Sequence, residues 1–106
     1  GHDWLILKLG SPCKAELILV DTLHFKGNFP DSCSIEGCFE PNANSESILL
    51  DNVAWMEILP KNKLKSHTEH IFNIELKNSG QCTHLRLNIF PDGGVSRLRI
   101  FGRPIT

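Results

Sequence analysis

Apolar residues recur along this chain at every second position, or in short runs that turn residues interrupt. No stretch keeps the i, i+3, i+4, i+7 spacing of a long amphipathic helix. Residues 4–9 predict a first strand, which Gly10-Ser11-Pro12 ends. Residues 15–21 predict a second strand, with a core too apolar for an exposed edge. The pattern therefore indicates β-structure from the start of the chain.

Residues 33–40 alternate between apolar and polar positions, which predicts a half-buried strand. Its apolar face would hold Cys33, Ile35, Gly37 and Phe39, and its polar face Ser34, Glu36, Cys38 and Glu40. Farther along, residues 48–50 and 55–59 form short apolar segments whose state the pattern leaves open. Residues 60–68 predict an exposed connection, and residues 70–76 predict a further strand.

The clearest local signal is a turn near the end of the sequence. Residues 83–90 and 95–102 flank Pro91-Asp92-Gly93-Gly94, which supplies a fixed φ and then two residues that adopt positive φ easily. This pattern predicts a β-hairpin. One face would carry alternate aliphatic side chains, and the other would be polar through His84 and Asn88 and rich in positive charge through Arg86, Arg97 and Arg99.

Together these segments predict an all-β fold, a two-sheet β-sandwich or jelly roll of about seven short strands. A length of 106 residues fits one domain, so residues 1–106 are expected to form a single unit. A jelly roll usually has about eight strands, and this chain begins directly on a strand. We therefore expect that an N-terminal strand that would complete the sheet is missing.

Composition and charge exclude two classes of partner. The chain is 41% apolar, and no apolar run approaches the roughly 18 residues that cross a bilayer, so no membrane role is expected. Its net charge is −1, without the broad positive field that binds nucleic acid. The start of the sequence lacks a signal-peptide pattern, which favours an intracellular, cytoplasmic location. Four cysteines are expected as thiols, with two disulfides as the alternative: Cys13, Cys33, Cys38 and Cys82.

The loop after residue 21 carries candidate catalytic residues. His24 could serve as a general acid or base near neutral pH, Asp21 could orient it, and Asn28 could donate a hydrogen bond to a developing oxyanion. Rigid strand ends often present such side chains to a ligand. The alternative is structural, because Asp and Asn also close loops through bonds to their own backbone.

The polar face of the predicted hairpin is a candidate anion site. A guanidinium fork matches a carboxylate, and Arg86, Arg97 and Arg99 share this face. Asn88 and His84 would add neutral hydrogen bonds beside them. The alternative is that the arginines are solvated or paired with nearby carboxylates.

Other notable residues fit structural roles better. Trp4 and Trp55 are expected in the core, and Glu57 is expected as a surface charge rather than a base. His67 and His70 could bind one metal ion on a helix, but on a strand they point to opposite faces. We therefore expect a loop histidine followed by a strand histidine, and no metal site.

Three segments make the chain resemble the allantoicase family over essentially its whole length. These segments are Asp3-Trp4 through Gly10, the string from Val20 to Asp31 that contains His-Phe-Lys-Gly-Asn-Phe-Pro, and residues 83–99. The pattern Glu57-Ile58-Leu59-Pro60 and the pair His70 and Phe72 add weaker support.

The resemblance implies a jelly-roll repeat of galactose-binding-like type, and the second, C-terminal repeat of a two-repeat hydrolase. The implied reaction is hydrolysis of allantoate to ureidoglycolate and urea in purine (uric acid) catabolism. The resemblance also implies a homo-oligomer. No cofactor is expected, with a divalent metal as an open alternative. The substrate has one carboxylate and two ureido groups. Arg86 or Arg97 would hold the carboxylate, Asn28 and Asn88 the ureido groups, and His24 with Asp21 would handle the proton.

Two alternatives to catalysis remain open. The same architecture hosts non-catalytic ligand recognition, and the repeat could be structural while its companion carries the chemistry. By itself the repeat is expected to show weak or no activity.

Overall fold

The computed structural model describes residues 3–23, 30–77, 80–91, 95 and 97–104. The prediction of an all-β fold is confirmed, since six strands and one short 3₁₀ helix account for the regular structure of these residues. The elements are β1 (Asp3–Asp21), β2 (Ser32–Cys38), η1 (Ser47–Leu49), β3 (Met56–Lys63), β4 (Glu69–Phe72), β5 (Cys82–Phe90) and β6 (Arg97–Pro104). In the described part of the chain, no helix has the length and apolar character needed to cross a bilayer.

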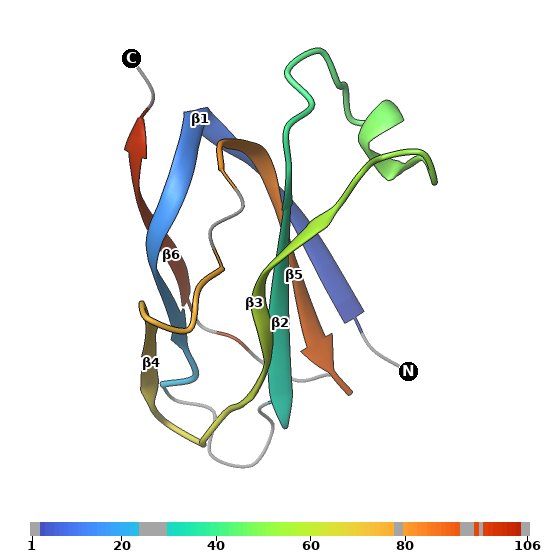
Figure 1. Cartoon of the computed structure of the whole chain (residues 1–106). Coiled ribbons are helices and arrows are strands. Elements are labelled where there is room, and N and C mark those ends of the chain that lie inside the picture. The colour runs from blue at the N-terminus through green and yellow to red at the C-terminus, as the bar shows by residue number, and fades with distance from the viewer. Residues whose placement is uncertain (1–2, 24–29, 78–79, 92–94, 96, 105–106) are drawn as a thin grey trace.

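Strand β1 belongs to both layers of the fold (Figure 1). Its first half pairs with β5, from Asp3 opposite Ile89 to Lys8 opposite His84. Its second half pairs with β6 on one side and β4 on the other. The first layer therefore has the order β3-β2-β5-β1, the second has the order β6-β1-β4, and all pairs are antiparallel.

The expected break at Gly10-Ser11-Pro12 is wrong, because β1 runs through it as one strand. A register shift lies between Lys8 and Cys13 instead, and Cys13 is opposite both Cys82 of β5 and Pro104 of β6. Turn-forming residues thus mark the place where the strand changes partner rather than direction.

The predicted hairpin is also wrong, although both of its strands exist. In the described residues β5 and β6 pair with different halves of β1 and not with each other. Local turn chemistry contributes little compared with the apolar area that each strand buries. Leu85 and Leu87 of β5 are buried, and Leu98 and Ile100 of β6 pack against the same core. The turn residues 92–94 lie outside the described residues.

The core lies between the two layers and follows the predicted alternation. Ile18 and Val20 of β1 pack with Ile35 of β2 and with side chains from β3, β4 and β5. Gly37 allows this close approach, because a Cβ there would lie 2.4 Å from Cδ1 of Ile58. Phe39, predicted on the buried face, is 50% exposed because β2 ends at Cys38 and the alternation stops.

Two boundaries differ from the sequence prediction. Strand β3 runs through Pro60 to Lys63, where an exposed connection was expected. Pro60 is compatible with β3 because this strand ends the first layer and pairs only with β2 among the described strands. Strand β4 ends at Phe72, and the expected continuation to residue 76 is a turn.

Candidate functional site

The structure divides the sequence-predicted site residues into two groups. Arg86 and Asn88 lie together on β5, and Asp21 lies opposite Arg97 at the end of β1. His24 and Asn28 lie outside the described residues. The first group belongs to the outer face of the first layer, and the second belongs to the second layer.

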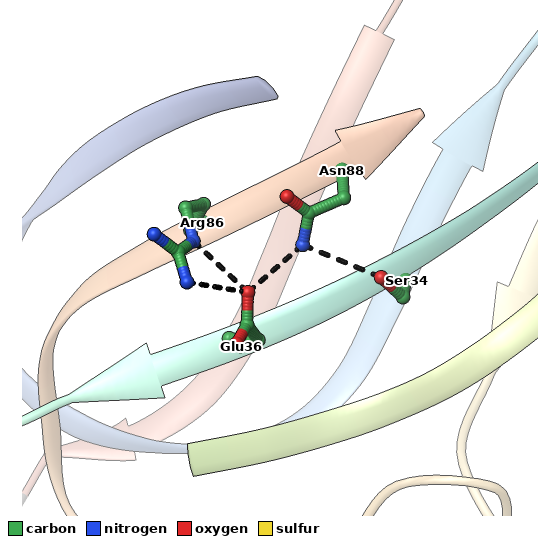
Figure 2. A network of polar contacts seen from close by, with 4 residues as sticks. All are labelled: Ser34, Glu36, Arg86 and Asn88. Atoms are coloured by element: carbon green, nitrogen blue, oxygen red, sulfur yellow. Dashed lines mark hydrogen bonds and ion pairs between the residues drawn. The ribbon is translucent and has the colours of Figure 1, made fainter. Parts of the chain in front are cut away.

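Arg86 and Asn88 both bind Glu36 of the neighbouring strand β2 (Figure 2). Arg86 donates from Nε and Nη2 to Oε1 of Glu36 at 2.9 and 2.8 Å. Nδ2 of Asn88 donates to the same oxygen at 3.0 Å and to Oγ of Ser34 at 3.3 Å. We call these four residues the Glu36 network. A single carboxylate oxygen thus fixes the orientation of both side chains.

Sequence reasoning did not identify Glu36 or Ser34 as site residues. The signal was available, because both residues occupy the polar face predicted for the strand at residues 33–40. What the sequence could not supply was the strand pairing. In the structure, Glu36 stands opposite Arg86 and Ser34 opposite Asn88, which brings opposite charges together across two strands.

An open cavity of about 530 Å³ lies over the Glu36 network. Trp4 and Phe90 line it beside the four network residues, and Glu57 completes the lining. Trp4 is 53% exposed, so its expected place in the core is wrong. Trp4 faces outward because it lies directly opposite Asn88 on the polar side of the β1–β5 pair. We call this space the Trp4 cavity.

Two further contacts support the walls of the Trp4 cavity. The guanidinium of Arg86 lies 4.5 Å from the ring centre of Trp55, so this half-buried ring supports the arginine rather than the core. The ammonium of Lys61 lies 4.2 Å from the ring centre of Phe90. Glu57 forms an ion pair with Lys77, and both side chains are exposed, in agreement with the expected surface charge.

The second group lies where β1 ends. Asp21 is 3% exposed, and its Oδ1 accepts a hydrogen bond from the backbone N–H of Leu23 at 2.7 Å. Asp21 is opposite Glu69 of β4 on one side and exposed Arg97 of β6 on the other. We call Asp21, Thr22, Glu69 and Arg97 the Asp21 corner.

Thr22 ties the Asp21 corner to the connection before β4. Its buried hydroxyl donates to the carbonyl of Lys65 at 2.6 Å and accepts from the backbone N–H of Thr68 at 3.1 Å. The backbone N–H of Thr22 donates to the carbonyl of Thr68 at 2.9 Å. Three bonds therefore hold the point where the strand gives way to the loop.

The three arginines do not form one cationic face. Arg86 is bound to Glu36 in the first layer, whereas Arg97 and Arg99 are opposite Asp21 and Leu19 in the second layer. Both sets point away from the core, and the core lies between the two layers. The expectation of a shared arginine surface depended on the hairpin and fails with it.

The segment with His24 and Asn28 connects the two groups along the chain. It leaves the Asp21 corner at Leu23, which Asp21 binds. It returns before Asp31, whose backbone N–H donates to the carbonyl of Phe90 at 2.9 Å. Phe90 lines the Trp4 cavity. The flanking residues of this segment are therefore attached at both places.

The described histidines show no arrangement for binding a metal ion. His67 lies in a turn and His70 in β4, as expected from the sequence. Both ring nitrogens of His70 are engaged, because Nε2 accepts from the backbone N–H of Lys65 at 2.8 Å and Nδ1 contacts the carbonyl of Val20 at 3.0 Å. No cluster of three potential metal ligands occurs in the described parts of the chain.

Burial controls the protonation of several groups near the sheet. Burial, together with the positive charge of Lys8, lowers the pKa of His84, whose Nδ1 lies 2.8 Å from Oγ1 of Thr83. Burial raises the pKa of Cys33 to about 12. Burial and the charge of Glu40 raise the pKa of Cys38 to about 11. These two thiols are therefore protonated near neutral pH and are poor nucleophiles. All four cysteines are thiols rather than disulfides, as predicted.

Comparison with known proteins identifies the family. The family model described as "Allantoicase repeat" matches residues 1–105. A protein of Pseudomonas aeruginosa (strain LESB58) named "Probable allantoicase" is 56% identical over 104 residues, which are 98% of this chain and 31% of that protein. A protein of Pseudomonas fluorescens (strain SBW25) with the same name is 52% identical over 103 residues. These cover 97% of this chain and 31% of that protein.

Solved structures agree with the sequence comparisons. The crystal structure of allantoicase from Saccharomyces cerevisiae matches with a TM-score of 0.77 and 36% identity, over 96% of this chain and 28% of that chain. This chain thus spans about a third of the length of the relatives that it matches. The match of the family model to nearly every residue shows that the chain belongs to the allantoicase family.

Proposed function

We propose that this chain is the second repeat of a two-repeat allantoicase and contributes side chains to the hydrolysis of allantoate to ureidoglycolate and urea. Support comes from the family match and from relatives named "Probable allantoicase". Because the chain spans 31% of such a relative, the activity is proposed for the full-length protein. In this proposal the enzyme is cytoplasmic and homo-oligomeric and needs no organic cofactor.

The chemistry requires three kinds of group. A cation holds the substrate carboxylate, amides bind the ureido groups, and an acid protonates the nitrogen of the departing urea. The bond between the central carbon of allantoate and the nitrogen of one ureido group breaks. The oxygen of a water molecule bonds to that central carbon. In the proposed mechanism His24 handles the proton and Asp21 orients His24. Asn28 and Asn88 bind the ureido groups.

The two candidate cations differ in availability. Arg86 is already bound to Glu36 through Nε and Nη2, whereas Arg97 is exposed at the Asp21 corner. Arg97 and Asn88 point away from opposite sides of the core, so one allantoate molecule reaches only one of them. We therefore propose Arg97 for the carboxylate of a substrate held at the Asp21 corner, and Asn88 for a ureido group of a substrate held in the Trp4 cavity.

The residues on either side of positions 24–29 support this proposal. Before them, the backbone of Leu23 binds Asp21, and after them the backbone of Asp31 binds Phe90, which lines the Trp4 cavity. His24 and Asn28 follow the Asp21 corner directly in the sequence. Loop residues held between rigid strands commonly carry catalysis.

Urea release from allantoate by the full-length protein tests the proposal. We expect His24→Ala to lower kcat by a factor of about 100 to 10,000, the range for loss of a general acid, with an unchanged circular dichroism spectrum. His67→Asn is a matched control, because Asn tolerates the positive φ of 49° at this turn position. Unchanged turnover in a folded His24→Ala protein would contradict the role of His24. Assay after treatment with a chelator decides whether a divalent metal takes part.

A non-catalytic binding repeat is the second candidate. The exposed aromatic side chain of Trp4 beside an open cavity favours it, since such surfaces also serve recognition alone. The two candidates predict different kinetics. If this repeat only binds or supports its companion, substitutions at Asp21, His24 and Arg97 will leave kcat for allantoate unchanged in the full-length protein.

A further inference from the structure

The Glu36 network leaves both donors and acceptors available at the base of the Trp4 cavity. Oε1 of Glu36 accepts three hydrogen bonds, and Oε2 takes part in none of them. Figure 2 shows the remaining guanidinium nitrogen of Arg86 and the amide oxygen of Asn88 pointing away from Glu36. The cavity base thus offers a donor on Arg86 and acceptors on Asn88 and Glu36.

The ion pair at the cavity base disfavours an anionic ligand group. Glu36 neutralises Arg86 at 2.8 Å, and the second carboxylate of the lining, Glu57, is itself paired with Lys77. A ligand carboxylate would displace Glu36 from Arg86 or lie next to it as a like charge, and both arrangements cost free energy. A neutral group with N–H donors and a carbonyl oxygen incurs neither cost.

The walls of the cavity include two aromatic side chains. The rings of Trp4 and Phe90 border the polar base, and the volume of about 530 Å³ lies within the range of small-molecule sites. Aromatic faces pack against planar groups with little loss of contact area. A ureido group is planar, neutral, rich in N–H donors and supplied with one carbonyl oxygen.

We infer that the Trp4 cavity is a subsite for a neutral ureido group. Glu36 is a specificity-determining residue that accepts from the ureido N–H groups and keeps Arg86 unavailable to carboxylates. Arg86 donates to the ureido carbonyl, and Asn88 accepts a further N–H. This assignment rests on the proposed function for the relevance of ureido compounds, and it deepens that function by naming the residues that would contact a ureido group.

Three ligands with the same carboxymethyl group test the inference. N-carbamoylglycine carries a ureido group, N-acetylglycine an amide and guanidinoacetate a cation. The full-length protein is labelled with fluorotryptophan, and fluorine NMR then reports ligand binding at Trp4. The resonance of Trp4 is assigned as the one that is absent from the spectrum of the Trp4→Phe variant. We expect N-carbamoylglycine to shift this resonance with the lowest Kd of the three.

Glu36→Gln provides the decisive variant. It should raise the Kd of N-carbamoylglycine about tenfold, because hydrogen bonds to charged groups are the stronger ones. It should leave the Kd of N-acetylglycine unchanged or lower it, because Arg86 becomes available to a carboxylate. Glu46→Gln makes the same chemical change at an exposed loop residue outside the cavity lining and should alter neither Kd.

Each other outcome overturns the inference. If Glu36→Gln weakens N-carbamoylglycine and N-acetylglycine equally, Glu36 has a purely structural role. If guanidinoacetate binds more tightly than N-carbamoylglycine, the cavity is a cation site. The proposed function fails independently. If the protein hydrolyses allantoate but N-carbamoylglycine does not shift the Trp4 resonance, the proposed function stands and the subsite is wrong. If the protein binds N-carbamoylglycine at Trp4 but does not hydrolyse allantoate, the subsite stands and the proposed function is wrong.

Discussion

The Glu36 network and the Asp21 corner hold their polar side chains by different means. In the Glu36 network, four side chains from two adjacent strands bind one another directly. In the Asp21 corner, Asp21 binds the backbone of Leu23, and Thr22 binds the backbone of Lys65 and Thr68. The first arrangement orients side chains, and the second fixes the path of the chain.

This difference indicates a division of labour within one repeat. Side chains locked on paired strands keep their geometry when a ligand arrives, which suits recognition. A corner that holds the entry to a loop can deliver residues of that loop to a substrate, which suits proton transfer. We therefore expect substitutions in the Glu36 network to affect stability and ligand selectivity, and substitutions near the Asp21 corner to affect turnover.

The largest expected effect on stability contrasts two arginines. Arg86→Leu removes two of the three donors from Glu36, whose side chain is 27% exposed, and should lower the free energy of unfolding by about 1.5–3 kcal/mol. Arg97→Leu, on the exposed face of β6, should change it by less than about 0.5 kcal/mol. Thermal unfolding of the full-length variants measures both, and equal losses would remove the distinction between the two regions.

A smaller effect is expected at Thr22. Thr22→Val keeps the shape of the side chain but removes its bonds to Lys65 and Thr68, so the free energy of unfolding should fall by about 1–2 kcal/mol. Thr22→Ser keeps the hydroxyl and serves as the control. If the serine variant loses as much stability as the valine variant, packing of the methyl group rather than hydrogen bonding holds the Asp21 corner.

The smallest effect concerns His84, on the same strand face as Arg86. Its folded-state pKa is lowered by burial and by Lys8, so below the unfolded-state pKa of about 6.5 the unfolded chain binds more protons than the folded protein. The free energy of unfolding should therefore fall as the pH drops below about 6.5. His84→Gln should reduce this slope, and an unchanged slope between pH 7 and pH 5 would show that His84 does not contribute.

The alternation of apolar and polar residues predicted most strands because it is a local property. Side chains of a strand point to opposite faces in turn, so burial of one face selects a period of two. This rule placed Ile35, Leu85 and Leu87 in the core correctly and placed Glu36, Arg86 and Asn88 on polar faces. It also predicted the all-β fold, and the motifs at residues 3–10, 20–31 and 83–99 indicated the family.

Strand pairing was decided only by the tertiary structure. The sequence at residues 91–94 favours a hairpin locally, but β5 and β6 pair with separate halves of β1 and contribute side chains to the same core. The same pairing sets Glu36 opposite Arg86 and turns Trp4 outward. The sequence therefore determined which residue types could form the site. Which of them meet depended on contacts between residues about 50 positions apart, because the free energy of burial is shared across the whole fold.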